Sequence, residues 1–257
     1  MITIVITVKN RCEHFLQTFP SAITQYGTDY NILYVDFVSD DGFQESILEE
    51  VRKREKMFSP YLNRIEYCLS EEDLKFNPRK ARNIGFHFAS QDSDKIAFSD
   101  VDVFIGMDYL SYWSNKVVCG EAFVATRVCE SRAGFPFRLR PEINYGNVIV
   151  SSADYERVRG FDEGVGSWGG DDDDLYHRLK LSGLREINPH NEFEAKQYSI
   201  LHGDKLRLSF MENQDRNEKE STWEYIYGQT DCVNKNDDYF NGNAVFNKEI
   251  LYSKSKG

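Results

Sequence analysis

The sequence lacks the features that define several large classes of protein. No apolar run reaches the roughly 18 residues of a membrane-spanning helix, and segment 1–10 is too short for a signal peptide. The net charge of −11 and the pI near 5.0 argue against nucleic acid as a partner, because a phosphate backbone attracts basic surfaces. We therefore expect a cytoplasmic protein without a membrane span, or one that is peripheral at the inner membrane through its substrate.

Cysteine is also scarce and follows no pattern. The chain has five cysteines and no C-x-x-C pair, so neither a zinc site nor a disulfide framework is indicated. We expect reduced, mostly buried thiols at Cys12, Cys68, Cys119, Cys129 and Cys232. Because no repeat and no linker divides the sequence, we expect one domain over residues 1–257.

Strands and helices are expected to alternate in the first part of the chain. Apolar, β-branched runs predict buried strands, and apolar residues at helical spacing predict helices between them. The strands are expected at 2–8, 32–38, 65–69 and 96–99, and the helices at 13–26, 44–57 and 78–88. This order predicts an α/β fold with a doubly wound, mostly parallel sheet, which binds ligands at the carboxyl ends of its strands.

The second part of the chain is more mixed. Strands are expected at 117–128 and 147–150, and a helix is expected to begin at Asp171.

Two carboxylates, Asp100 and Asp102, follow directly on the fourth predicted strand. At that place they face solvent rather than a core, and their oxygens suit a hard divalent cation held together with phosphates. We expect Mn²⁺ there, with Mg²⁺ as the alternative. His202 is a candidate third ligand, since an imidazole would favour Mn²⁺; a hydrogen-bonded structural histidine is the other interpretation.

Four consecutive aspartates, Asp171 to Asp174, open a predicted helix. One or two acids satisfy a helix N-terminus, whereas four repel one another, which indicates a functional reason for the others. We expect Asp172 to be a general base that takes a proton from an acceptor hydroxyl, and Asp171 to orient that acceptor. Asp173 or Asp174 is expected to cap the helix or pair with Arg178.

The residues before these acids are expected to lie on the acceptor side. The predicted acceptor-binding residues are Trp168, Gly169, Gly170 and Asp173. An indole stacks well on a sugar face, but a role of Trp168 as a buried anchor is equally open.

Polar residues at the other strand ends are candidates for binding a donor nucleotide. The candidates are Lys9, Arg11, Asp36, Asp40, Arg79 and Arg82. Arginine suits bidentate phosphate contacts, although a cluster such as Arg79 and Arg82 also fits a solvated helix face. Asp36 and Asp40 either contact uracil and ribose or cap a turn.

Several segments resemble the β-1,4-galactosyltransferases. Residues 98–102 (FSDVD) and 168–173 (WGGDDD) resemble that family's metal and catalytic motifs, the second of which usually reads WGGEDDD. Segments 76–86 (FNPRKARNIGF), 9–11 (KNR) and 201–205 (LHGDK) resemble its donor-side, nucleotide-binding and metal-histidine segments. The likeness runs in the same order over about residues 2–205, and polymerases of the chondroitin type share much of it.

The resemblance implies a GT-A-type fold and an inverting transfer from a UDP-sugar to a sugar hydroxyl of a glycan or glycolipid, in polysaccharide biosynthesis. It also implies that Asp100, Asp102 and His202 bind Mn²⁺, that Asp172 is the base, and that Asn83 lies on the donor side.

The resemblance further implies a division of the chain into two halves. A UDP-sugar-binding half would cover about 1–103 and an acceptor-binding, catalytic half about 104–205. The polar, charge-rich segment 203–221 fits either a mobile lid or a surface loop, and the resemblance implies a loop that closes over the donor. The tail at 222–257 has no assigned place.

The sequence also departs from the family pattern. Asp171 replaces the usual glutamate, and Pro78 stands where the family has a donor-contacting arginine, so Arg79 or Arg82 would supply that charge. Asn144 stands where galactose-specific members have a tyrosine. This smaller residue would leave room for an N-acetyl group, so both UDP-Gal and UDP-GalNAc are candidate donors.

Two other functions fit the same motifs. A retaining GalNAc-transferase of the mucin-initiating type has similar metal and glycine–acid motifs, and a non-catalytic module could bind a sugar or a cation. A nucleotidyltransferase is disfavoured, because no glycine-rich phosphate loop follows the first strand.

Overall fold

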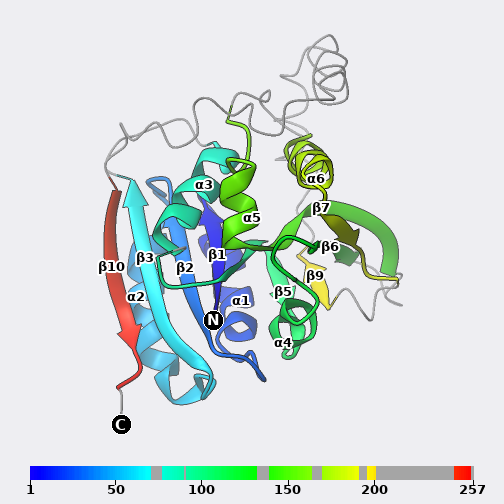
Figure 1. Cartoon of the computed structure of the whole chain (residues 1–257). Helices are drawn as coiled ribbons and strands as arrows, with labels where there is room; N and C mark the ends of the chain where they lie inside the picture. Colours follow the sequence, from blue (N-terminus) through cyan, green and yellow to red (C-terminus); the bar gives the residue numbers. More distant parts are fainter. Residues whose placement is uncertain are drawn as a thin grey trace.

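The computed structural model describes residues 1–70, 77–89, 91–131, 139–163, 170–190, 196–200 and 246–255. For residues 127–131, 139–146 and 246 it describes the backbone alone. The ten strands of the described chain form one mixed sheet with helices on both faces (Figure 1).

The first half of the chain alternates strands and helices, as predicted. Its elements are β1 (Ile2–Val8), α1 (Cys12–Ala22), β2 (Tyr30–Asp36), α2 (Phe43–Arg54), the 3-10 turn η1 (Glu55–Met57), β3 (Leu62–Ser70), α3 (Pro78–Ala89) and β4 (Lys95–Asp100). β1 lies between β2 and β4, β3 lies beside β2, and all these pairs are parallel. The predicted α/β fold with a mostly parallel, doubly wound sheet is confirmed.

Two predicted elements end earlier than expected. The predicted helix 13–26 ends at Ala22, because the N–H of Tyr26 donates to the carbonyl of Met107 instead of continuing the helical ladder. The predicted strand 32–38 ends at Asp36. Val38 beyond it has φ = 51°, which no strand residue adopts.

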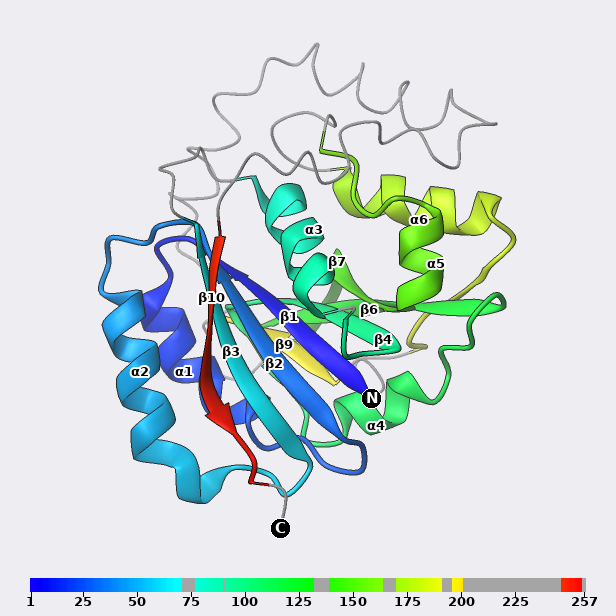
Figure 2. The same ribbon diagram turned by 60° about the vertical axis from the view of Figure 1, so that its left-hand side comes forward.

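The second half is mostly antiparallel. Its elements are β5 (Val103–Ile105), α4 (Tyr109–Ser114), β6 (Ala122–Ser131), β7 (Leu139–Ser151), α5 (Ser152–Arg157), α6 (Asp171–Leu181), β8 (Arg185–Ile187), β9 (Gln197–Ser199) and β10 (Phe246–Ser253). The strand order is β10-β3-β2-β1-β4-β7-β6-β9-β5, with β8 beside β6. The tail that the sequence left without a place therefore supplies an edge strand, β10, which runs antiparallel to β3 (Figure 2).

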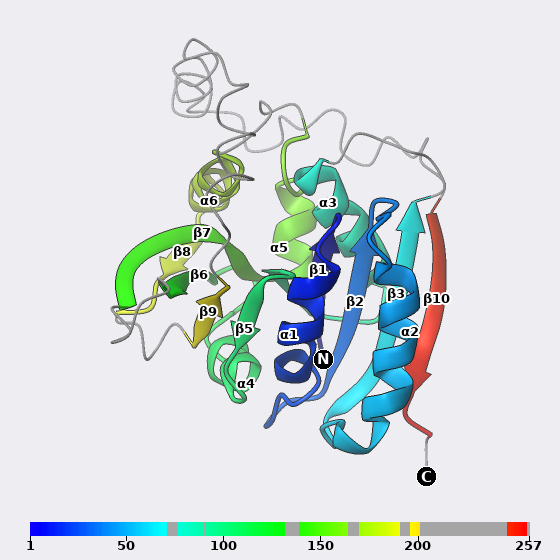
Figure 3. The same ribbon diagram turned by 180° about the vertical axis from the view of Figure 1, so that it is seen from behind.

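The two faces of the sheet carry separate apolar cores. Alternate side chains of a strand point to opposite faces, so Ile4 and Ile6 of β1 pack with α1, α2 and α4, whereas Val5 packs with α3, α5 and α6. Figure 3 shows α1 and α2 covering the near face of the sheet. None of the helices among the described residues is both long and apolar enough to cross a membrane.

Helix α3 lies unusually close to β1. A Cβ atom added at Gly85 would come within 2.2 Å of Val5 Cγ1, so only glycine lets the helix approach this near. This close packing fixes the height of α3 over the sheet, and thereby the position of the side chains on its first turns.

Candidate active site

The carboxyl ends of β1, β2 and β4 lie side by side at one edge of the sheet. In register, Thr7 pairs with Asp100 and Val8 pairs with Asp36. The strand-end residues that the sequence singled out are therefore neighbours in space, as the predicted topology requires.

Asp100 ends β4, and Asp102 lies in the turn before β5. The Asp100 side chain is 42% exposed, and Asp102 is half-buried. The N–H of Ile200 donates to the carbonyl of Asp102 at 2.8 Å, so the chain that leaves β9 lies against this turn. His202 follows two residues later in the sequence and lies outside the described residues.

These two carboxylates fit a hard divalent cation. No third histidine, cysteine or acid joins them within the described part of the chain. A cation here would therefore take its other ligands from phosphate oxygens, from water or from a residue such as His202.

Arg82 connects this turn to the row of four aspartates. From α3, its Nη1 donates to Asp171 Oδ2 at 2.7 Å and its Nη2 donates to Asp100 Oδ1 at 3.1 Å. Asp172 Oδ1 lies 3.7 Å from Nη1. The predicted metal residues and the predicted catalytic residues thus form one site, and a buried arginine holds them together.

Helix α6 begins at Asp171, after Gly170 in the left-handed conformation (φ = 78°). All four aspartates lie in its first turn. Asp174 is buried and pairs with Arg178, whose Nε and Nη2 donate to Asp174 Oδ2 at 2.8 and 2.6 Å. Arg178 also donates to the carbonyls of Val158 and Gly160. The predicted pairing of one acid with Arg178 is confirmed for Asp174, and it ties α6 to the turn after α5.

The first three acids have different surroundings. Burial, and then the charge of Asp171, raise the pKa of Asp172 well above its ordinary value, while Arg82 opposes this shift. The buried Oδ1 of Asp172 accepts no hydrogen bond in the described structure. The pKa of Asp173 is also raised, first by burial and then by Asp171. A shielded carboxylate with a raised pKa and an unused oxygen is what a general base needs.

Arg79, on α3, and Arg11, before α1, are the other arginines predicted to bind the donor. Arg79 is buried on α3, with Nη2 at 3.9 Å from Asp171 Oδ1, and burial lowers its pKa. Arg11 immediately precedes α1 and is half-buried.

The loops after β1 and β2 contact each other at the carboxyl ends of these strands. Lys9 Nζ donates to the carbonyl of Val38 at 2.6 Å. The N–H of Asp40 donates to Asn10 Oδ1 at 2.9 Å, and Asp40 itself is exposed. Asn10 and Val38 both have positive φ, 52° and 51°, so the two loops hold each other in an uncommon backbone conformation.

Asp36 caps a turn, which was one of its two predicted roles. Its Oδ1 accepts from the N–H and the hydroxyl of Ser39 at 3.0 and 2.6 Å, and its Oδ2 accepts from Tyr67 Oη at 2.7 Å. Burial raises its pKa. Because both oxygens already accept hydrogen bonds, the geometry favours turn capping over contact with a base.

Asn83, a predicted donor-side residue, is instead used inside the protein. Its Oδ1 accepts from Tyr155 Oη at 2.7 Å and from the N–H of Phe161 at 2.9 Å. Its Nδ2 donates to the carbonyl of Phe161 and to Glu163 Oε1, both at 2.8 Å. These four bonds exhaust an amide's capacity, so the side chain supports the site rather than contacting a ligand.

Phe161 is the partner that the sequence analysis missed. Its ring lies 4.9 Å from the Arg82 guanidinium. The only sequence signal was an aromatic residue between a glycine and two acids.

Three predicted residues lie outside the described residues: Trp168, Gly169 and His202. For Asn144 only the backbone is described, paired with Val128 across β6 and β7. Their predicted roles remain predictions.

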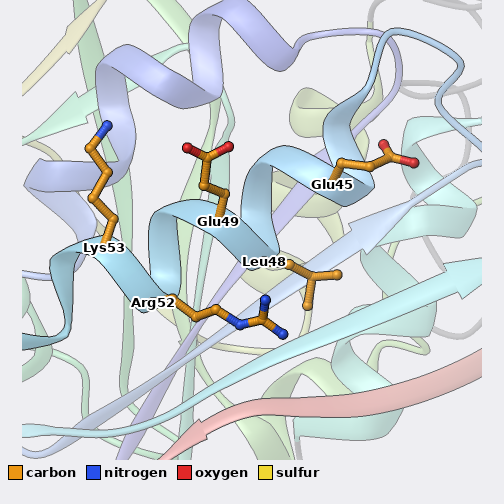
Figure 4. A pocket seen from close by; sticks show the side chains of 5 residues that line it. All are labelled: Glu45, Leu48, Glu49, Arg52 and Lys53. Atoms are coloured by element: carbon orange, nitrogen blue, oxygen red, sulfur yellow. The ribbon is translucent and has the colours of Figure 1, made fainter.

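A hollow on the outer face of α2 lies away from this site. It is lined by Glu45, Leu48, Glu49, Arg52 and Lys53 (Figure 4). Since one helix supplies the whole lining, the hollow encloses no ligand-sized space, and it bears none of the predicted residues.

Comparison with known proteins identifies the fold and the family that this chain resembles. A family profile described as the N-terminal domain of galactosyltransferase matches residues 127–202. A mutant of the Drosophila β-1,4-galactosyltransferase 7, in complex with manganese, UDP-Gal and xylobiose, matches 86% of this chain and 78% of its own, with a TM-score of 0.56 and 20% identity. This chain has the GT-A glycosyltransferase fold.

A second structure with the GT-A fold is also similar. The mannosyltransferase PcManGT from Pyrobaculum calidifontis, in complex with GDP-Man and Mn²⁺, matches 89% of this chain and 69% of its own, with a TM-score of 0.59 and 14% identity.

Curated relatives are similar over part of the chain. β-1,4-Galactosyltransferase 2 of Cricetulus griseus is 29% identical over 155 residues, which are 52% of this chain and 40% of the relative. Human β-1,4-galactosyltransferase 1 is 31% identical over 121 residues, 46% of this chain and 28% of the relative. The aligned part thus covers less than half the length of these relatives. The predicted resemblance to β-1,4-galactosyltransferases is confirmed.

Proposed function

We propose that this chain is a Mn²⁺-dependent, inverting glycosyltransferase. It moves galactose or N-acetylgalactosamine from a UDP-sugar to a sugar hydroxyl of a glycan or glycolipid acceptor. The observation that carries the proposal is the ion-pair network of Arg82, which joins Asp100 of the metal motif to Asp171, beside the base Asp172. The similar solved structures, in complex with manganese and sugar nucleotides, support it.

Asp100 and Asp102 are the residues of this chain that hold the cation. When bound there, the cation balances the negative charge that builds up on the departing diphosphate. Lys9, Arg11 and Arg79 supply further positive charge at the same edge of the sheet.

Asp172 supplies the base. The acceptor hydroxyl oxygen forms a bond to the anomeric carbon while the bond from that carbon to the diphosphate breaks, and the hydroxyl proton passes to Asp172. Its shielded position and raised pKa suit it to accept that proton. Trp168, Gly169, Gly170 and Asp173 form the acceptor side in this proposal.

The donor depends on Asn144 in this proposal. An asparagine leaves more room near the sugar 2-position than the tyrosine of galactose-specific relatives, so UDP-GalNAc is accepted beside UDP-Gal. Strict use of UDP-Gal in a donor panel would refute this part.

The test is UDP release with Mn²⁺ against UDP-Gal, UDP-GalNAc, UDP-Glc and UDP-GlcNAc, with GlcNAc and glucuronide acceptors. Asp172→Asn should lower kcat by about 10²- to 10⁴-fold, while UDP still binds. Asp92→Asn, an exposed acid that pairs with Arg64, is the matched control and should keep full activity.

Three outcomes separate the alternatives. A product with the donor's anomeric configuration, read by NMR, would indicate a retaining enzyme. Binding of glycan without any requirement for nucleotide would indicate a non-catalytic module. Failure to bind UDP with Mn²⁺ would overturn the proposal.

A further inference from the structure

Arg82 is buried more deeply than an arginine that binds a donor needs to be. Its side chain is 6% exposed, although it lies at the edge of the sheet where ligands bind. Both terminal nitrogens already donate, one to Asp171 and the other to Asp100. The Nε of Arg82 has no hydrogen-bond partner among the described residues, but it is buried, so a phosphate ligand could reach it only if the surrounding side chains moved.

The surroundings of Arg82 also hold it in place. Phe161 stacks against its guanidinium at 4.9 Å, and the backbone of Phe161 is bonded in both directions to Asn83, the next residue on α3. Moving the guanidinium toward a ligand would break its hydrogen bond to Asp171 Oδ2, in a side chain that is only 12% exposed. Breaking a buried pair in this way is strongly unfavourable.

The carboxylates around Arg82 come from two elements that are far apart in the sequence. Asp100 ends β4, while Asp171 and Asp172 begin α6. These acids repel one another unless a positive charge lies between them. In the described structure that charge is the Arg82 guanidinium.

We propose that Arg82 is a positioning residue and not a donor ligand. It sets the distance between the metal-binding carboxylate Asp100 and the first turn of α6, so that the cation and the base Asp172 act on the same pair of substrates. This inference rests on the proposed function of the site.

The kinetics of Arg82→Lys distinguish a positioning residue from a donor ligand. Arg82→Lys keeps the charge but cannot reach two carboxylates at once in a planar fork. We expect kcat to fall at least 10-fold, while KM for the UDP-sugar stays within about 2-fold of wild type. The affinity for Mn²⁺, measured by EPR in the absence of any sugar, should weaken no more than about 3-fold, because Arg82 and the cation compete for Asp100 instead of supporting each other.

A second variant tests the inference independently in case Arg82→Lys does not fold. Phe161→Leu leaves every charge in place but removes the ring that stacks on the guanidinium, and it should give the same pattern with a smaller fall in kcat. Arg64→Lys, which changes an arginine paired with Asp92 near the start of β3, is the matched control and should leave kcat and KM unchanged. Melting temperatures confirm that each variant is folded.

Other results would overturn the inference. A rise of 10-fold or more in donor KM with little change in kcat would make Arg82 a donor ligand. A fall in melting temperature with unchanged kcat would make it merely structural. If wild type itself neither binds UDP with Mn²⁺ nor releases it from a sugar, the proposed function fails; if only the Arg82→Lys pattern differs, this inference alone fails.

Discussion

Two hydrogen bonds, one in each direction, join the side chain of Asn83 to the backbone of Phe161, which lies 78 residues further along the sequence. The amide oxygen of Asn83 accepts from the N–H of Phe161 at 2.9 Å, and its amide nitrogen donates to the carbonyl of Phe161 at 2.8 Å. The Asn83 amide thus pairs with the backbone of Phe161 as a neighbouring strand would. It holds the loop that carries Phe161, whose ring lies against Arg82.

Asn83→Ala should therefore affect stability more than donor binding. It removes the hydrogen bond to the Phe161 carbonyl and the shorter of the two made by the Phe161 N–H, which also donates to Tyr155 Oη at 3.3 Å. A buried polar group left unsatisfied costs about 1–3 kcal/mol. Urea unfolding measures the loss. The Kd for UDP with Mn²⁺, measured on the folded protein, should stay near wild type. A large rise in that Kd with unchanged stability would restore the donor-side role predicted from sequence.

Gly85→Ala should push α3 away from β1. The added methyl would clash with Val5 Cγ1, and such overpacking typically costs about 1–3 kcal/mol of stability. UDP release should fall too, because α3 carries Arg82. In the double variant Gly85→Ala/Val5→Ala the space is restored, so its loss of stability should be smaller than the sum of the two single losses. If the loss of stability in the double variant equals the sum of the two single losses, the methyl added at Gly85 does not clash with Val5.

Asp174→Asn should destabilise the protein far more than Asp92→Asn. The pair of Asp174 with Arg178 is buried, both side chains being 1% exposed, and removal of one partner from such a pair costs about 3–5 kcal/mol. Asp92 pairs with Arg64 at the surface and is 43% exposed. An exposed ion pair of this kind contributes only about 0–1 kcal/mol to stability. Equal losses in chemical denaturation would contradict the assignment of Asp174 as a structural anchor of α6.

Asp36 should make stability depend on pH in the acid range. Burial raises its pKa in the folded protein above the ordinary value of 3.8, so the folded state binds this proton more tightly than the unfolded chain. Its protonation therefore stabilises the fold, and this stabilisation is lost as pH rises from about 3.8 through the raised pKa. In Asp36→Asn this contribution is absent, so the unfolding free energy should fall less, or rise more, with pH over that window than it does in the wild type. A wild-type curve that rises more steeply than the variant's in that window would contradict the shift.

The sequence predicted much of the fold because the decisive signals are local. All seven residues of the run Ile2–Val8 are β-branched and only Thr3 and Thr7 are polar, which is typical of a strand covered on both faces, and the structure buries every one of them. The position of Asp100 at a strand end followed from the apolar residues before it. Parallel topology then brought the strand ends together without any knowledge of side-chain contacts.

Elements without local periodicity could not be placed in this way. β10 reads as a short polar and aromatic stretch, and its position depends on the edge that β3 offers through backbone hydrogen bonds. Sequence patterns do not show which edge is free. The same holds for β9, whose three residues pair with β5.

By itself, the sequence determined which chemical groups this protein brings to the carboxyl edge of its sheet: two aspartates after a buried strand, four at a helix start, and arginines on α3. Only the tertiary structure decided what each of them does. Arg82 and Asp171 are separated by 89 residues, and a buried charge takes whichever opposite charge the packing of its helix places within reach. That packing depends on Gly85 against Val5 and on Asn83 against Phe161, contacts between distant segments that no local pattern encodes.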